Sequence, residues 1–471
     1  MNIFLVYPHF GLEPSYNCGL GYIAAVLQKE LHAVSYLRLG NDADVAAFLL
    51  KITREQPDII GFSLTTCQLI HVKRILPLIR QQSRALLVAG GIHPTVEPAC
   101  LEQLPELDAI VRGEGEWPMR DLAAALRDGQ DYRSLAGFCF RTAAGTIGNG
   151  LRRLIPDLDA LPFPYHDPAD YQAVIDASGG MHRMIFSRGC TFGCPYCSND
   201  ALRRIFKGQG TYHRARSPEQ AIAEIARDAR QFRFGFLFFD DDALTLDKDW
   251  CLEFMRLYGR KFAYPFYCNV RPGTLDGELI AAIAAAGARG IALGVEHGNE
   301  AFRRTVLKRN VSDAAIRRTV ELCRQAGIKE VYGQVMIGLP HENLELYLDS
   351  VRLCRSLGVI PFRYIYSPYP GTELGLLCAQ HQWLPDKESF TERREAVIDF
   401  PGFRRADIQL GFDVFSLLVR LPLLPLRVPG ITTSTLLRIY RPVVTVLRPA
   451  VGALWDAWQP FRQWVVVRPH A

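Results

Sequence analysis

Three cysteines near the middle of the chain have the spacing C-x3-C-x2-C. They are Cys190, Cys194 and Cys197, and Gly193 and Pro195 stand between them. Short spacers with glycine and proline let a loop wrap tightly enough for three thiolates to meet one iron–sulfur cluster. A complete cluster normally takes four cysteines, so three leave one iron open, much as a catalytic zinc site keeps an open position. No histidine or fourth cysteine follows at the spacing of a zinc site, so we expect a catalytic iron–sulfur centre.

Residues 187–197 resemble the signature of the radical S-adenosylmethionine (radical SAM) superfamily, including the aromatic Tyr196 before the last cysteine. The resemblance implies that the three cysteines hold a [4Fe–4S] cluster and that SAM chelates the open iron through its amino and carboxylate groups. It further implies that an electron from the cluster cleaves SAM to a 5′-deoxyadenosyl radical. A reductase, a flavodoxin or a ferredoxin is then expected as the electron donor.

The composition limits the class of protein. With 471 residues and 49% apolar content the chain can form two or three domains with real cores, and its net charge of +5 argues against a dedicated nucleic-acid binder. The other cysteines stand singly in apolar segments, which predicts reduced, buried thiols and a cytoplasmic protein without a second cluster. The first residues lack a basic flank and a cleavage site, so no signal peptide is expected. The scattered cysteines are Cys18, Cys67, Cys100, Cys139, Cys251, Cys268, Cys323, Cys354 and Cys378.

The first third alternates between short apolar runs and helical patterns. This alternation predicts an open parallel sheet of the doubly wound, Rossmann-like kind, whose ligands bind at the carboxyl ends of the strands. The expected strands are 3–7, 34–37, 58–63, 85–91 and a fifth beginning at 108, and the expected helices include 19–27, 68–80 and 118–126.

Two of these strand ends and the charged run at 112–116 resemble the cobalamin-binding domain that precedes many radical SAM cores. The resemblance covers residues 1 to about 130, with the domain expected at 1–140. The motif D-x-H-x-x-G is absent, so cobalamin is expected with its base off and without a histidine ligand; a hydrogen-bonding role is favoured for His93 over cobalt ligation. The implied cobalamin-binding residues are Ser63, Thr65, Gly90, Gly91, His93, Thr95 and Glu116.

Residues 141–180 are rich in proline and have little periodicity, which predicts a linker. A partial (β/α)6 barrel is expected over 181–385, because six apolar runs follow and each ends at a polar group or a glycine. Ser217, Pro218 and Gln220 have the pattern of a helix start. Parallel barrels form their active sites at the carboxyl ends of their strands. The expected strands are 183–187, 235–239, 266–270, 290–295, 330–337 and 362–366.

The residues at these strand ends match radical SAM positions that contact SAM. The resemblance implies that Asp241 lies near the amino group, that Arg271 holds the carboxylate and that Glu296 accepts hydrogen bonds from the ribose. The backbone at Gly338 and the main chain at Tyr196 would flank the adenine.

Each of these residues also has a structural alternative. Any one of the aspartates 240–242 could instead cap the following helix, and Arg271 could form a surface ion pair. Glu296 ends a very apolar strand, where an unpaired carboxylate is costly, so a partner is expected.

Residues 386–471 form an expected helical carboxy-terminal region. From residue 412 onward it contains seven arginines, two aspartates and the tryptophans Trp455, Trp458 and Trp464. No stretch approaches ~18 uncharged apolar residues, so a membrane-spanning helix is not expected. A cap over the barrel mouth is favoured slightly over peripheral contact with an anionic membrane surface.

The sequence therefore predicts a cobalamin-dependent radical SAM enzyme of the α/β class, with C-methylation of an unactivated carbon in a small molecule or lipid as the favoured reaction. The resemblance implies that methylcobalamin donates the methyl group and that a second SAM restores it. No residue identifies the substrate, and no catalytic side chain is assigned. The alternatives are a radical SAM cyclase or rearrangement enzyme, a tRNA methylthiotransferase, a relative without bound cobalamin and a non-catalytic iron–sulfur scaffold.

Overall fold

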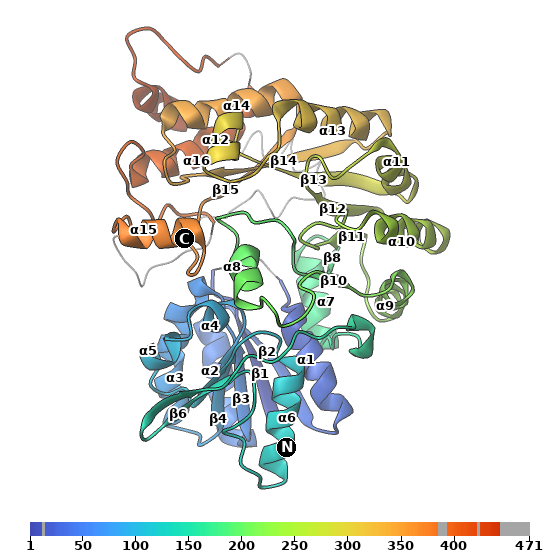
Figure 1. Ribbon diagram of the computed structural model, residues 1–471, viewed down its shortest axis with the longest axis vertical. Helices are drawn as coiled ribbons and strands as arrows, with labels where there is room; N and C mark the ends of the chain where they lie inside the picture. Colours follow the sequence, from blue (N-terminus) through green and yellow to red (C-terminus); the bar gives the residue numbers. More distant parts are fainter. Residues whose placement is uncertain (12–14, 385–392, 422–423, 443–471) are drawn as a thin grey trace.

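Two β-sheets, each built mainly of parallel strands, organise the chain (Figure 1). The computed structural model describes residues 1–471 except 12–14, 385–392, 422–423 and 443–471. In Figure 1 the amino-terminal sheet and its helices fill the lower half, and the second sheet and its helices fill the upper half. Helix α8 (Ser198–Ile205) lies between the two halves.

The amino-terminal sheet has the strand order β2-β1-β3-β4-β5-β6-β7. Strands β1 to β5 pair in parallel, which confirms the predicted Rossmann-like sheet. Strands β6 and β7 extend the sheet as an antiparallel hairpin. Its strands are β1 (Asn2–Pro8), β2 (Ala33–Leu39), β3 (Ile59–Ser63), β4 (Leu86–Gly90), β5 (Ala109–Val111), β6 (Phe138–Thr142) and β7 (Gly145–Gly148).

Helices cover both faces of this sheet. Phe4 and Val6 of β1 pack in one core layer, while the alternate residues Ile3 and Leu5 pack in the other. Successive side chains of a strand point to opposite faces, so a strand buried on both sides is apolar throughout. The helices are α1 (Cys18–Lys29), α2 (Asp42–Glu55), α3 (Leu69–Arg80), α4 (Ile92–Val96), α5 (Cys100–Gln103) and α6 (Glu116–Arg127), and a short 3-10 helix η1 spans Thr66–Gln68.

The segment predicted as a linker contains regular structure. Strand β7 lies within 141–180, followed by a 3-10 turn η2 (Leu158–Ala160) and helix α7 (Pro168–Ala177). All residues of β7 are exposed, so the alternation that marks a half-buried strand is missing from its sequence. Helix α7 begins as its sequence indicates, because the Asp167 side chain accepts a hydrogen bond from the backbone of Asp170 and proline follows the cap.

The second sheet has the order β15-β14-β13-β12-β11-β8, and all five pairings are parallel. The edge strands β15 and β8 do not pair with each other, so the sheet is the predicted half-barrel. The first strand lies two residues earlier than predicted: β8 ends at Met184, and Ser187–Arg188 form a separate strand β9 that pairs with β10 (Arg214–Ala215). The barrel strands are β8 (Met181–Met184), β11 (Phe236–Phe239), β12 (Phe266–Val270), β13 (Ala288–Glu296), β14 (Glu330–Ile337) and β15 (Ile360–Ile365).

Helices cover one face of this sheet, and aromatic side chains gather on the other. Phe236, Phe238, Tyr267 and Tyr332 form a buried cluster apart from the main barrel core. Ser217 caps α9 by accepting a hydrogen bond from the Gln220 backbone, as predicted. The helices are α9 (Pro218–Gln231), α10 (Lys248–Lys261), α11 (Gly277–Ala285), α12 (Glu300–Thr305), α13 (Asp313–Gln325) and α14 (Leu344–Leu357).

The described part of the carboxy-terminal region is helical. Helix α15 (Glu373–Gln380) follows the last barrel strand, and α16 (Arg405–Arg420) packs against β15 and α14. Arg363 of β15 donates a hydrogen bond to the Phe412 carbonyl, which fixes α16 on the barrel. Within the described residues no helix has the length and apolarity that crossing a membrane requires. The three tryptophans of the tail lie outside the described residues.

Asp241 joins the end of β8 to the end of β11. Its Oδ1 accepts hydrogen bonds from the backbone N–H groups of Phe186 (3.0 Å) and Ser187 (2.7 Å) and from the Ser187 hydroxyl (2.5 Å). The side chain is fully buried. The carboxylate therefore holds the chain in place just before the cysteine loop begins.

Replacement of Asp241 tests this role. Asp241→Ala leaves two backbone donors without their acceptor, and we expect the free energy of unfolding to fall by about 3 kcal/mol. Asp241→Asn keeps an oxygen acceptor, so its free energy of unfolding is expected to fall by less than half as much as that of Asp241→Ala. Urea denaturation measures both, with the exposed Asp249→Ala as the control. Equal stability of the alanine variant and the wild type would contradict the role.

Candidate cofactor sites

The cysteine loop connects β9 to α8. The Cys197 N–H donates to the Cys194 carbonyl, and α8 begins directly after Cys197. Gly189 has φ 83°, and a Cβ there would lie 2.4 Å from the Tyr212 carbonyl oxygen, so only glycine fits before the first cysteine.

The thiols of this loop are partly or wholly shielded from solvent. Cys194 is buried, and Cys190 and Cys197 are half-buried. Burial raises the pKa of Cys197 to about 12 and raises the pKa of Cys190, so a bound cation is needed to hold these groups as thiolates. In the described part of the chain no three His, Cys, Asp or Glu side chains converge on a single metal ion, and cysteines that bind separate irons of one cluster need not do so.

Two arginines lie against the cysteine loop. The Arg271 guanidinium stacks on the Phe192 ring at 3.7 Å from its centroid, and its Nη1 is 3.6 Å from the Cys194 Sγ. The buried Arg309 also reaches the Cys194 thiol and donates to the Gly294 carbonyl at 2.7 Å. The Arg271 charge lowers the pKa of Cys190 and so offsets part of the increase that burial causes. Arg271 is thus where the sequence predicts it, at the strand end beside the cysteines, whereas no sequence motif marks Arg309.

Glu296 lies at a distortion of the barrel. The pairing of β13 with β14 shifts register between Gly294 and Glu296, and Glu296 has φ 66°. A left-handed conformation at a residue other than glycine is strained, and such strain concentrates at functional sites. The Glu296 carboxylate is 3.6 Å from Arg309 Nη1, so it has the partner that its apolar strand requires. Desolvation, and then the Glu296 charge, raise the pKa of the half-buried Tyr196.

The acidic side chains that follow β11 lie on different faces of the barrel sheet. Asp240 pairs with Arg183, whose guanidinium lies over the Phe238 ring among the aromatic residues of the barrel. Asp241 has no exposed surface, and its charge acts on Cys251 and Cys268 in the main core. The prediction that Asp241 contacts the amino group of SAM is therefore corrected: successive residues alternate between faces, and Asp240 is the one on the aromatic side.

Gly338 directly follows β14, and Tyr196 lies in the cysteine loop. Gly338 has φ 85°, and its N–H donates to Glu342 Oε2 at 2.6 Å. A Cβ at this glycine would lie 2.7 Å from Ile408 of α16. The backbone of Gly338 is therefore held by the fold, with its donor already used. Tyr196 contributes a half-buried ring that packs against the barrel core.

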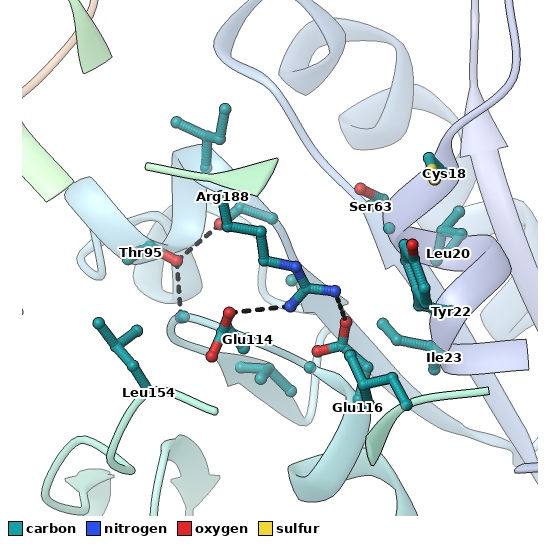
Figure 2. A pocket seen from close by; sticks show the side chains of 18 of the residues that line it. Cys18, Leu20, Tyr22, Ile23, Ser63, Thr95, Glu114, Glu116, Leu154 and Arg188 are labelled. Carbon is teal, nitrogen blue, oxygen red and sulfur yellow. Dashed lines mark hydrogen bonds and ion pairs between the residues drawn. The ribbon is translucent and has the colours of Figure 1, made fainter. Parts of the chain in front are cut away.

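A cavity of about 390 Å³ lies where the amino-terminal strand ends face the cysteine loop (Figure 2). Leu20, Tyr22 and Ile23 of α1 form one side of it. Aliphatic and aromatic walls with a few polar groups are typical of a cofactor site. Residues on both sides of the cysteine loop complete the wall, namely Ser187, Arg188 and Gly189 before it and Asn199, Leu202 and Phe206 after it.

Five of the seven predicted cobalamin-binding residues line this cavity: Ser63, Gly90, Gly91, Thr95 and Glu116. Gly91 has φ 100°, and a Cβ there would lie 2.8 Å from the Leu64 carbonyl oxygen, so glycine is required. The Thr95 hydroxyl donates to the Gly91 carbonyl and accepts from the Gly113 N–H, which ties two strand-end loops together. An apolar wall with a hydroxyl and bare backbone at its edge fits the flat ring and the amide groups of a corrin.

Thr65 and His93 do not line the cavity, which corrects their prediction as contact residues. The Thr65 N–H donates to Gln68 Oε1, and its hydroxyl contacts the Cys67 thiol, so it stabilises the start of η1. His93 is buried, its Nδ1 lies 3.1 Å from the Thr66 hydroxyl, and burial lowers its pKa to about 4. No histidine is among the described residues that line the cavity.

Sequence reasoning missed several charged residues of the cavity wall. Arg188 forms ion pairs with Glu114 at 2.8 Å and with Glu116 at 2.5 Å, as Figure 2 shows. Glu114 also pairs with Arg214 at 3.1 Å. The charged run 112–116 and the arginine before the first cysteine carried a signal, but no pattern indicates that the two meet.

Comparisons with known proteins match each half of the chain to a known domain family. Residues 13–123 match the B12 binding domain, and residues 184–354 match the radical SAM superfamily. An uncharacterized methyltransferase of Pyrococcus horikoshii is 25% identical over 76% of this chain and 77% of its own length. The anaerobic magnesium-protoporphyrin IX monomethyl ester cyclase of Rubrivivax gelatinosus is 26% identical over 77% of this chain and 68% of its own.

A solved structure shares the arrangement of both domains. The radical SAM methyltransferase TsrM from Kitasatospora setae, with cobalamin and a [4Fe–4S] cluster bound, superimposes with a TM-score of 0.67 at 20% identity, covering 81% of this chain and 78% of that one. The same enzyme has been solved with tryptophan and a SAM analogue. This chain therefore belongs to the radical SAM enzymes with a B12-binding domain, and its cofactors are a [4Fe–4S] cluster, SAM and cobalamin.

Proposed function

We propose that this protein is a C-methyltransferase that acts on an unactivated carbon of a small molecule or lipid. One observation carries the proposal: the segments directly before and after the cysteine loop both line the cavity at the amino-terminal strand ends. A corrin in that cavity and a cluster on that loop would face a common space. The name of the Pyrococcus relative and the fold shared with TsrM support methyl transfer.

We assign the cluster to Cys190, Cys194 and Cys197, whose loop is fixed by the Gly189 turn and by the start of α8. When bound, the cluster and SAM supply a 5′-deoxyadenosyl radical, and cobalamin supplies the methyl group. The chain's own contribution is placement, charge and exclusion of water. The burial of Cys194 beside the half-buried rings of Phe192 and Tyr196 limits access of water to the cysteine loop.

We assign SAM to the barrel strand ends beside this loop. The planar guanidinium of Arg271 can bind a carboxylate with two parallel hydrogen bonds, and its stacking on Phe192 keeps it beside the open iron. Glu296, oriented by Arg309, would accept hydrogen bonds from the ribose, and the main chain at Tyr196 and Gly338 would flank the adenine. Asp240 replaces Asp241 as the acidic residue expected near the amino group.

The second candidate is a radical SAM cyclase or rearrangement enzyme, which the Rubrivivax relative favours. A tRNA methylthiotransferase would need a second cysteine cluster. Cys67 and Cys100 are buried in different cores and Cys18 lines the cavity, so these three do not assemble one.

The byproducts of SAM distinguish methyl transfer from cyclisation. Protein reconstituted anaerobically with iron, sulfide and hydroxocobalamin is incubated with a reductant, methyl-deuterated SAM and small-molecule and lipid fractions. Methyl transfer is expected to release S-adenosylhomocysteine and 5′-deoxyadenosine together and to place the deuterated methyl group in a product. Substrate-dependent 5′-deoxyadenosine without S-adenosylhomocysteine would instead indicate cyclisation or rearrangement.

Cys194→Ala tests the cluster assignment. Removing one of three thiolates should reduce the iron content and abolish 5′-deoxyadenosine formation to below about one hundredth of the wild-type rate, since no other thiolate can replace it. The variant should still bind cobalamin, with the affinity of protein that lacks the cluster, because Cys194 does not line the cavity. Cys139→Ala, in β6 and outside both sites, is the matched control. Continued SAM cleavage by the Cys194 variant would refute the assignment.

Arg271→Met tests the SAM carboxylate assignment. Loss of a charge-assisted hydrogen-bond pair should weaken SAM binding about tenfold to a hundredfold. Equilibrium dialysis with reconstituted protein measures the binding, and iron analysis confirms that the cluster is retained. Arg256→Met, which removes an exposed arginine of α10, should have no effect. An unchanged SAM affinity in the Arg271 variant would overturn the assignment.

A further inference from the structure

The cysteine loop and the cavity wall are one continuous piece of chain. Arg188 lies two residues before Cys190, and Asn199 lies two residues after Cys197. Both side chains belong to the cavity lining, as do Leu202 and Phe206 further along α8. A displacement of this wall is therefore transmitted to the cysteines through at most two peptide units on each side.

Arg188 attaches this wall to the amino-terminal domain. Its Nη1 donates to Glu114 Oε1 at 2.8 Å and its Nη2 to Glu116 Oε1 at 2.5 Å. The guanidinium also lies 5.1 Å from the centre of the Tyr22 ring. The side chain of Glu116 is 3% exposed, that of Glu114 is 14% exposed and that of Arg188 is 22% exposed.

Two further contacts support the same junction. Arg214 of β10 donates to Glu114 at 3.1 Å and to the Ile155 carbonyl at 2.7 Å. The Phe206 ring packs so closely on Gly113 that a Cβ at that position would lie 2.7 Å from it. Arg188 and Arg214 lie opposite each other in the antiparallel pair of strands β9 and β10. Both arginines of this two-stranded sheet therefore form ion pairs with carboxylates of the amino-terminal domain.

The ion pairs of Arg188 fix the position of the segment that leads into the cysteine loop. Buried ion pairs are weak sources of stability, because desolvation offsets most of their attraction, but they fix geometry strongly. Here the fixed element is the segment that leads into the first cysteine. The carboxylates that fix it belong to the loop after β5 and to the first residue of α6, and both line the cavity. A ligand that fills the cavity must contact this network.

We propose that Arg188 is a positioning residue that couples occupancy of the cobalamin cavity to the geometry of the cysteine loop through Glu114 and Glu116. Cobalamin and the cluster then bind cooperatively, because each stabilises the same arrangement of the wall. This inference rests on the cofactor assignments of the proposed function. It does not depend on the reaction or on the substrate.

The test is the affinity for hydroxocobalamin with and without the cluster. The dissociation constant is measured by equilibrium dialysis for reconstituted protein and for protein freed of iron by a chelator. For the wild type we expect the cluster to tighten cobalamin binding about tenfold, within the usual range of coupling between sites. For Arg188→Gln and for the milder Glu116→Gln we expect the ratio of the two dissociation constants to approach one.

The ratio separates coupling from a merely structural role. A structural defect would weaken cobalamin binding equally in both states and leave the ratio unchanged, which would overturn the proposal. Arg80→Gln, which breaks the ion pair to Asp108 within the amino-terminal domain, is the matched control and should keep the wild-type ratio. A wild-type ratio of one would also overturn the proposal, whatever the variants do.

A spectroscopic measurement gives an independent readout. The electron paramagnetic resonance signal of the cluster, kept reduced by excess dithionite, is recorded with and without cobalamin that has already been reduced to its Co(II) state, so that no electron transfer from the cluster changes the signal. A change in the wild type that is absent in Glu116→Gln supports the coupling, and an identical change in both contradicts it. No substrate is present, so this result does not depend on whether the protein transfers methyl groups. If the wild type does not bind cobalamin, both the coupling and the cobalamin assignment of the proposed function are wrong.

Discussion

The structure depends on one geometric constraint: two parallel sheets turn their carboxyl ends toward a shared space. Parallel sheets place their ligands at that edge, because the loops after the strands carry free backbone groups and polar side chains there. In this chain the amino-terminal strand ends and the cysteine loop line one cavity. The ion pairs of Arg188 with Glu114 and Glu116 hold the two sides together across it.

Charge is distributed in accordance with the proposed cofactor sites. Arg271 and Arg309 lie against the cysteine loop, where a bound cluster and a SAM carboxylate would add negative charge. The cobalamin cavity is mainly apolar, and most of its charged groups are already paired with each other. Radical chemistry and a reactive corrin both require exclusion of water, and the close packing of Phe206 on Gly113 seals the junction.

Local patterns predicted much of this arrangement. The strand–helix alternation predicted the parallel order, and Ser217 caps the helix that follows it, whereas helix α7 lies in the segment predicted as a linker. The side chains whose direction differs from the prediction, Asp241 and His93, share one cause. Which face Asp241 occupies depends on where β8 stops and on its pairing with β11, and His93 is buried because α4 packs it away from the cavity. A one-residue change of register reverses the direction of a side chain, and sequence patterns locate strand ends less accurately than that.

The sequence by itself indicated the cofactors, because the cysteine spacing is a local requirement of cluster binding and because the motifs around it and at the amino-terminal strand ends resemble families that bind SAM and cobalamin. It also determined the order of the elements that present them. Only the tertiary structure decided that Asp240 rather than Asp241 lies on the aromatic side of the barrel, that Arg309 supports Glu296, and that Arg188 meets carboxylates more than seventy positions away. The first two contacts arise from strand register and packing within the barrel, and the third from the meeting of the two halves of the chain. No periodicity in any of these segments indicates its partner.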